Sequence, residues 1–287
     1  MRAKRHAENF PVALRALPRR ERRDLIAVYD VARVIDDLGD EADGNRTARL
    51  TEFGHDLAGI WEGRAPSHPV LRRLVPTVAE RGLPQEPFQR LLRANLMDQR
   101  VRRYHSYAEL RAYCELSAHP VGRIVLGVFE VTDPALAELS DRVCAALQLV
   151  EHWQDVGEDR RAGRVYLPAD EMARFGVTEA DLDASTAGPR LRRLMTFQTK
   201  RAAELLDSGS GLVGELHGWA RLAVAGYVAG GMAAVDALRR TDGDVLGRVP
   251  RTRRRDVARH AVGLLARAAL GQRGRHQRHG RRGEEVP

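Results

Sequence analysis

Apolar residues recur every three to four positions along most of the chain, which is the period of amphipathic and buried helices. The one short run typical of a strand is GRVYLP at 163–168. The pattern therefore predicts one all-α domain over residues 1–270, a bundle whose helices are separated by prolines. The predicted helices cover residues 22–38, 47–63, 86–101, 106–118, 134–156, 189–207, 212–240 and 253–270.

Basic residues are concentrated near the C-terminus. The formal net charge is +8, but the segment from Arg248 to the end carries all of this excess, so the preceding residues are almost neutral. Residues 271–287 are rich in arginine and poor in apolar side chains, and we expect a disordered basic tail. Aromatic residues do not alternate with these arginines, so nucleic acid is not the main partner that we expect. Weak attraction of the tail to anionic lipid or nucleic acid is the alternative.

The cysteines and the apolar segments of the sequence indicate where in the cell the protein is located. Cys114 and Cys144 fall in separate predicted helices without the spacing of a metal or redox motif. The first 18 residues lack the apolar segment and cleavage site of a signal peptide. The longest apolar run, residues 222–235, is too short and too rich in glycine to span a bilayer. We expect a cytoplasmic protein with reduced thiols that contacts a membrane surface at most transiently.

Two acidic clusters interrupt otherwise apolar helix faces, and each contains two aspartates four positions apart. The clusters are Asp36 with Asp40, and Asp155 with Asp159; Gln148 and Glu151 extend the second stripe backwards along the same predicted helix. Carboxylates at this spacing repel each other, and a helix C-terminus already carries partial negative charge. If the two helices face each other across the bundle, all four carboxylates meet in one cavity.

Close carboxylates either take up protons or bind cations. Mg²⁺ uses one or two carboxylates and completes its shell with water and substrate phosphate, so the clusters predict a Mg²⁺ site for a phosphorylated substrate. Four arginines are near enough in sequence to bind the phosphates, namely Arg33, Arg160, Arg161 and Arg164. The alternative is a pair of exposed helix ends with local ion pairs, such as Arg33 with Asp37.

No other chemistry is comparably marked. The chain has no glycine-rich dinucleotide or Walker loop, no HExxH and no GxSxG. Its histidines are isolated in sequence, and His276 and His279 in the predicted tail lack carboxylate or cysteine partners.

The segments YDVARVIDDLGDE (29–41) and LQLVEHWQDVGEDRRAGRVYLP (147–168) resemble the two aspartate-rich signatures of the squalene/phytoene synthase family. Enzymes of this family join two prenyl diphosphates head to head, and the resemblance runs from about residue 8 to about residue 250. Three further segments are most similar to the hydroxysqualene synthases of bacterial hopanoid pathways. These are ENFPVA (8–13), DQRVRRY (98–104) and YCELSAHPVGRIVL (113–126).

The resemblance implies an isoprenoid-synthase bundle around a central apolar cavity, with a prenyl diphosphate as substrate and Mg²⁺ as cofactor. The implied metal ligands are Asp36, Asp40, Asp155 and Asp159. The implied neighbours of the substrate are Tyr29, Arg33, Arg164 and Tyr166 near the diphosphate, Gln148 and Glu151 beside the second metal helix, and Asn9 and Phe10 near the cavity mouth. One position departs from the family pattern: relatives usually have Asn where this chain has Glu151, and often Phe where it has His152.

In the hydroxysqualene subfamily, presqualene diphosphate loses its diphosphate and water captures the carbocation, so NADPH is not required. The resemblance therefore predicts hydroxysqualene formation. The alternative within the family is condensation of two farnesyl or geranylgeranyl diphosphates to presqualene diphosphate, squalene or phytoene. A non-catalytic assembly protein of the same fold is the alternative of another class, but the four retained aspartates favour an enzyme.

Overall fold

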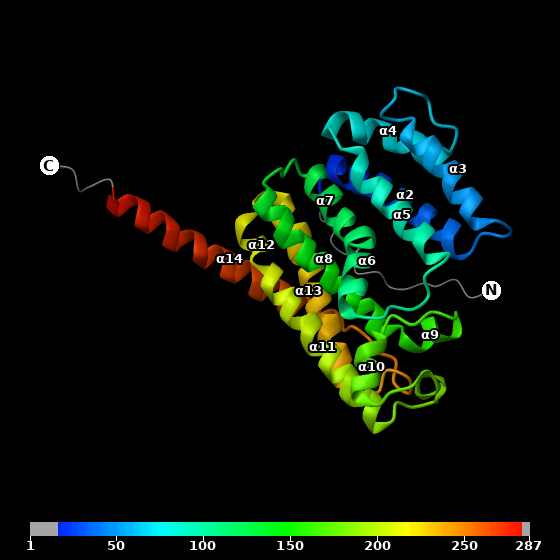
Figure 1. Ribbon diagram of the computed structural model, residues 1–287. Helices are drawn as coiled ribbons and strands as arrows, with labels where there is room; N and C mark the ends of the chain where they lie inside the picture. Colours follow the sequence, from blue (N-terminus) through cyan, green and yellow to red (C-terminus); the bar gives the residue numbers. More distant parts are fainter. Residues whose placement is uncertain (1–16, 283–287) are drawn as a thin grey trace.

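The computed structural model describes residues 17–282, in which α-helices are joined by short loops, and this confirms the predicted all-α fold (Figure 1). Within these residues, extended backbone pairs only in one isolated bridge between Arg103 and Val165, so GRVYLP does not form a regular strand. The elements are α2 (Arg19–Asp40), α3 (Arg46–Ala58), α4 (Pro69–Arg81), α5 (Gln85–Asp98), α6 (Tyr107–Ser117), α7 (His119–Val128), α8 (Pro134–Gln154), α9 (Val156–Arg161), α10 (Ala169–Phe175), the 3₁₀ helix η1 (Glu179–Asp183), α11 (Pro189–Ser210), α12 (Leu212–Glu215), α13 (Gly218–Arg240) and α14 (Arg254–Arg282).

The helix prediction was wrong at several places. Helices α4, α7 and α10 were not predicted, and the predicted helix 212–240 is two helices, because Leu216 and His217 have extended backbone. Pro69 and Pro120 stand in the first turn of α4 and α7. Proline is tolerated there because the first N–H groups of a helix have no intrahelical partner, so these prolines begin helices.

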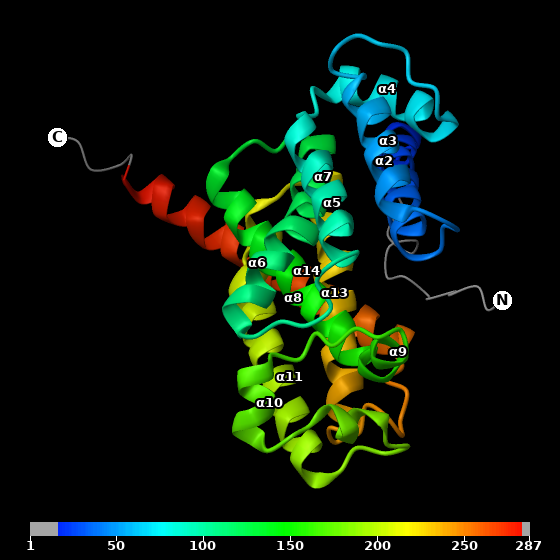
Figure 2. The same ribbon diagram turned by 45° about the vertical axis from the view of Figure 1, so that its right-hand side comes forward.

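Two clusters of buried apolar side chains hold the bundle together. The N-terminal core joins α2, α3, α4, α5 and α7. The main core is built largely on α6, α8, α11, α13 and α14. Helix α7 belongs to both, since Ile124 and Val128 face the N-terminal core and Leu126 faces the main core. Figures 1 and 2 show α2, α3 and α4 grouped at one side of the long helices α8, α11 and α13.

Helix α13 packs closely against its neighbours. A Cβ atom on Gly231 would lie 2.4 Å from Cδ2 of Leu147 and 3.1 Å from Cδ2 of Leu206, so glycine permits this contact with α8 and α11. Among the described residues, α13 is the one helix long and apolar enough to cross a membrane, but 67% of its apolar window is buried in the molecule. Helix α13 is therefore buried to the same degree as a core helix.

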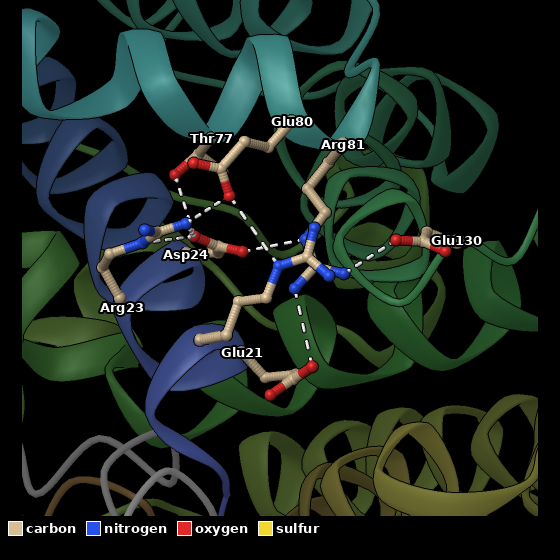
Figure 3. A network of polar contacts seen from close by, with 8 residues as sticks. Glu21, Arg23, Asp24, Thr77, Glu80, Arg81 and Glu130 are labelled. Carbon is tan, nitrogen blue, oxygen red and sulfur yellow. Dashed lines mark hydrogen bonds and ion pairs between the residues drawn. The ribbon is translucent and has the colours of Figure 1, made fainter.

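A buried ion-pair network anchors the N-terminal half of α2 (Figure 3). Asp24 has no exposed side-chain surface and accepts hydrogen bonds from Nε of Arg81 and Nε of Arg23, both at 2.8 Å. Arg81 also donates to Glu130, in the loop after α7, at 2.9 Å. Burial alone would raise the pKa of Asp24, but the two arginines lower it below its usual value. The network fixes α2 to α4 and to the end of α7.

Helix α14 continues to Arg282, so the predicted boundary at residue 270 falls inside a helix. The expected disorder of the basic tail, residues 271–287, stays a prediction. The two cysteines are free, and burial raises the pKa of both thiols to about 12, as expected for unreactive side chains.

Candidate active site

The first acidic cluster lies at the C-terminal end of α2, where it faces α5. Asp36 is exposed on one side and accepts a hydrogen bond from Nδ2 of Asn95 at 3.2 Å on the other. Gln99 Nε2 donates to the carbonyl oxygen of Gly39 at 3.0 Å, and a Cβ on Gly39 would lie 2.4 Å from Oδ1 of Asn95. Glycine at this position therefore permits α5 to approach the cluster.

The carboxyl group of Asp36 is a weaker acid than a free aspartic acid side chain. Desolvation by the surrounding protein raises its pKa to about 6; Asn95 opposes this rise, and the neighbouring charge of Asp40 adds to it. The last turn of α2 contains no basic residue. The basic residue of α2 that lies nearest to these aspartates is Arg33, one turn before the last.

The second cluster lies at the junction of α8 and α9. Asp155 is the residue between the two helices, with φ −101° and ψ 11°, so the expectation of one continuous helix through Asp155 and Asp159 was wrong. The N–H of Asp159 still donates to the carbonyl oxygen of Asp155 at 2.8 Å. This bond keeps the two aspartates about one turn apart across the junction.

Arg164 connects the two clusters. Its Nη1 donates to Oδ1 of Asp40 at 2.7 Å across 124 residues of sequence, and its backbone N–H donates to the carbonyl oxygen of Asp159 at 2.8 Å. Burial alone would lower the pKa of Arg164, but Tyr166, Asp40 and Asp159 raise it above its usual value. Only 18% of the side chain is exposed. The C-terminal ends of α2 and α9 therefore both lie beside the positive charge of Arg164.

The carboxylates are not gathered into a preformed metal centre. In the described part of the chain, no three His, Cys, Asp or Glu side chains lie close enough together to hold a metal ion. The local ion pair that we considered as the alternative is present, since Nε of Arg33 lies 3.5 Å from Oδ1 of Asp37. It coexists with the long-range contact of Arg164 with Asp40, so the first cluster is more than an exposed helix end.

Other predicted site residues lie at different distances from this meeting point. Arg160 points elsewhere and pairs with Asp183 of η1 at 2.7 Å. Gln148 contacts His152, with 3.3 Å between Nε2 atoms, while Glu151 is exposed. Tyr29 is half-buried on α2. Asn9 and Phe10 lie outside the described residues, so their predicted place at the cavity mouth stays a prediction.

A buried aromatic cluster adjoins Arg164. The ring centroid of Tyr166 lies 5.7 Å from that of Tyr104, 5.9 Å from that of Tyr113 and 3.7 Å from that of His152. Burial and the charge of Arg164 lower the pKa of His152 to about 3, so this imidazole is neutral. His152, Tyr166 and Asp159 line a small enclosed cavity with apolar walls from Val156, Val165, Leu167 and Leu182. Aromatic and carboxylate groups thus share one site.

Sequence reasoning missed Asp98 and Tyr113. The Tyr113 hydroxyl donates to Oδ2 of Asp98 at 2.6 Å. Burial raises the pKa of Asp98 to about 6, although Tyr113 and Arg164 oppose the rise. Both residues lie in segments that resemble the family, and this resemblance was the signal that could have pointed to them. Their contact joins the end of α5 to α6, and the sequence spacing of the two residues does not predict it.

Helical bundles build metal sites from side chains on facing helices, and Mg²⁺ sites with one or two carboxylates complete their shell with water and substrate phosphates. Residues 3–256 match the family model described as squalene/phytoene synthase. The chain belongs to the squalene/phytoene synthase family, and it is therefore a synthase of the prenyltransferase type.

Several relatives and solved structures are similar to this chain. A hydroxysqualene synthase from Rhodopseudomonas palustris is 35% identical over 210 residues, which cover 73% of this chain and 71% of that protein. A presqualene diphosphate synthase from the same organism is 32% identical over 176 residues, covering 60% of this chain and 62% of that protein. The squalene synthase HpnC from Alicyclobacillus acidocaldarius is 40% identical, with a TM-score of 0.76 over 83% of this chain and 90% of that one. A dehydrosqualene synthase in complex with ligand, at 24% identity, has a TM-score of 0.84 over 93% of this chain and 94% of that one, and supports the fold alone.

Proposed function

We propose that this enzyme converts presqualene diphosphate and water to hydroxysqualene and diphosphate, and that it requires Mg²⁺ but no NADPH. The observation that carries the proposal is the meeting of the two acidic clusters at Arg164. The similarity to proteins named hydroxysqualene synthase supports this reaction over the others of the family.

The donor set fits Mg²⁺. We infer that Asp36, Asp40, Asp155 and Asp159 hold it, because hard cations prefer carboxylate oxygens. Desolvation is the main cause of the raised pKa of Asp36, and the charge of Asp40 adds to it; a bound cation would favour the charged form of both carboxylates. Two separated pairs of aspartates suit an ion that takes one or two carboxylates and completes its shell from the substrate. When bound, Mg²⁺ would neutralise negative charge on the leaving diphosphate.

The side chains of the protein bind the diphosphate and enclose the cation. We infer that Arg164 and Arg33 bind diphosphate oxygens, so that Arg164 exchanges its contact with Asp40 for one with the substrate. The carbon–oxygen bond to diphosphate then breaks and leaves a carbocation. Buried aromatic rings limit the access of water to the carbocation and stabilise its positive charge through their π faces. Water adds to the cation, and the proton that it loses goes to the released diphosphate.

The second candidate is condensation of two farnesyl diphosphates, and the similarity to a presqualene diphosphate synthase favours it. Both reactions begin with the same loss of diphosphate, so the acidic clusters do not distinguish them. We further propose a cytoplasmic protein that contacts a membrane transiently. Trp219 and Leu222 are exposed apolar side chains three positions apart on α13, and they support such contact.

The decisive experiment incubates purified protein and Mg²⁺ separately with presqualene diphosphate and with farnesyl diphosphate, without NADPH, and identifies products by mass spectrometry. We expect hydroxysqualene from presqualene diphosphate and no consumption of farnesyl diphosphate. Consumption of farnesyl diphosphate would favour the condensing synthase. Turnover of neither substrate would favour a non-catalytic member of the fold.

Substitution of the aspartates tests the site. Asp36→Asn and Asp155→Asn should each lower turnover by at least about a hundredfold, because each removes charge that holds the diphosphate and its cation. Asp37→Asn is the matched control, since this neighbouring carboxylate pairs with Arg33 and is not a predicted ligand. Near-normal turnover of Asp36→Asn, with loss in Asp37→Asn, would assign the metal to the other face of α2.

A further inference from the structure

Asp98 and Tyr113 form a pair that the four-aspartate mechanism does not use. Asp98 is the last residue of α5, and Tyr113 lies in the middle of α6. The distance of 2.6 Å between the tyrosine hydroxyl and Oδ2 of Asp98 lies in the range of a charge-assisted hydrogen bond from O–H to a carboxylate. The hydroxyl hydrogen is thus directed to Asp98.

The pair lies within the site. The charges of Arg164, Asp40 and Asp36 all act on Asp98. The Tyr113 ring lies 5.5 Å from that of Tyr104. Burial and the charges of Tyr166 and Asp98 raise the pKa of Tyr113 well above its usual value, so this phenol stays neutral.

Two buried polar atoms at this pair and its neighbour Tyr104 have unused hydrogen-bonding capacity. Oδ1 of Asp98 and the hydroxyl of Tyr104 are buried and have no hydrogen-bond partner among the residues that the structure describes. An unpaired buried polar atom is costly, and such atoms are concentrated at functional sites. The arrangement of the pair therefore favours a role in contacting a ligand over a role in stabilising the fold.

We propose that Asp98 is a positioning residue that holds the Tyr113 hydroxyl hydrogen away from the substrate and makes the tyrosine oxygen and ring an electron-rich wall for the carbocation. This inference rests on the proposed function. The carboxylate acts through Tyr113, because a carboxylate oxygen in contact with a carbocation would trap it as an ester. Placed behind the phenol, its negative charge still stabilises positive charge in a site from which bulk water is excluded.

The proposal is tested with Asp98→Asn, Tyr113→Phe and the double variant, assayed with presqualene diphosphate and Mg²⁺. Asp98→Asn keeps an acceptor oxygen but removes the charge, so we expect kcat to fall on the order of tenfold to a hundredfold while KM changes little. In the Tyr113→Phe background the same substitution should have almost no further effect, because the two residues act as a unit. Tyr107→Phe, on the same helix and stacked on Arg201 at 3.4 Å, is the matched control.

A spectroscopic readout makes the test independent of turnover. With ¹³Cζ-labelled tyrosine, the Tyr113 resonance, assigned by its loss in Tyr113→Phe, should shift in Asp98→Asn, and the Tyr107 resonance should not. Additive losses of kcat in the double variant would overturn the proposal, as would an unchanged Tyr113 resonance. A raised Mg²⁺ requirement with unchanged kcat would make Asp98 a metal ligand and also overturn it. Absence of any turnover by the wild-type enzyme would reject the proposed function and the catalytic part of this inference, whereas the resonance would still decide whether the pair exists.

Discussion

Arg164 is the residue that turns two separate acidic segments into one site. Its side chain is mostly buried beside Asp40 and Asp159, so the protein itself supplies a positive charge where the clusters meet. A guanidinium can neutralise part of this charge in the absence of substrate and then bind diphosphate in its forked geometry. The like-charge spacing that is unfavourable on an isolated helix is thus tolerated in the folded protein.

The neutral imidazole of His152 makes stability depend on pH. Its folded pKa of about 3 lies below the unfolded value, so below about pH 6.5 the unfolded chain binds a proton that the folded chain does not. Stability is therefore lost as pH falls, by about 1.4 kcal/mol per pH unit from this residue. Between pH 7.5 and pH 5, His152→Phe should lose about 2 kcal/mol less unfolding free energy than the wild type.

Urea unfolding at the two pH values measures this difference. His105→Gln is the control, because it removes an exposed histidine and leaves His152 in place. Equal losses in His152→Phe and in the wild type would mean that His152 is protonated in the folded protein.

Glu151 should weaken the site that it borders. It is exposed beside the second cluster and adds a negative charge there. Glu151→Asn should therefore lower the KM for the diphosphate substrate at saturating Mg²⁺, since it reduces repulsion of the diphosphate. An unchanged KM would show that the charge is already compensated.

The spacing of residues predicted which aspartates are paired, but not which residues meet across the fold. Asp36 with Asp40 is a local relation, visible at four positions apart. The contacts of Arg164 with Asp40 and of Asp98 with Tyr113 depend on how helices pack, and hydrophobic periodicity sets that only coarsely.

At the scale of elements, the long helices were predictable and the junctions were not. Helices α8 and α11 have sustained apolar stripes, and the sequence places both to within a few residues. The break at Asp155 comes where a long helix passes into the short helix α9, which the 3₁₀ helix η1 contacts, so tertiary packing overrides a continuous pattern. The breaks that shape the site are therefore products of packing.

The close contact of α8 with α11 can be tested at Gly209. A Cβ there would lie 2.7 Å from the carbonyl oxygen of Leu139 and 2.9 Å from Cγ2 of Val143, so the backbone of α8 would have to move. Gly209→Ala should lower the unfolding free energy by about 1–3 kcal/mol. Gly214→Ala, which meets nothing within 4 Å, should have little effect or a small stabilising one. Thermal denaturation of both variants measures the difference, and equal stability would contradict the close contact.

At the scale of the whole molecule, the site lies between two cores. The first acidic cluster is carried by the N-terminal core and the second by the main core, and α7 belongs to both. The apolar pattern predicted enough buried surface for one helical bundle, but it did not predict that the core is divided into two clusters. An apolar stripe shows that one face of a helix is buried, but it does not show which other helix covers that face.

The network at Arg81 should matter for stability although it is remote from the acidic clusters. Arg81→Met removes one of the two guanidinium groups that bind the buried Asp24 and should cost up to about 3–5 kcal/mol. Adding Asp24→Asn removes the buried charge and should restore part of the loss. Lys200→Met removes an exposed pair with Glu204 and should cost less than about 0.5 kcal/mol. Urea unfolding of the three variants checks this order, and equal losses would show that the network is solvated.

The contact of Arg81 with Glu130 also sets an order of events during synthesis. The N-terminal core includes Ile124 and Val128, so α2 cannot be fully covered until α7 and Glu130 have left the ribosome. Asp36 and Asp40 can then be held in place before Asp155 and Asp159 have left the ribosome. A nascent chain stalled at the point where α7 has emerged should therefore already protect α2 from proteases, although Arg164 is not yet available to contact Asp40.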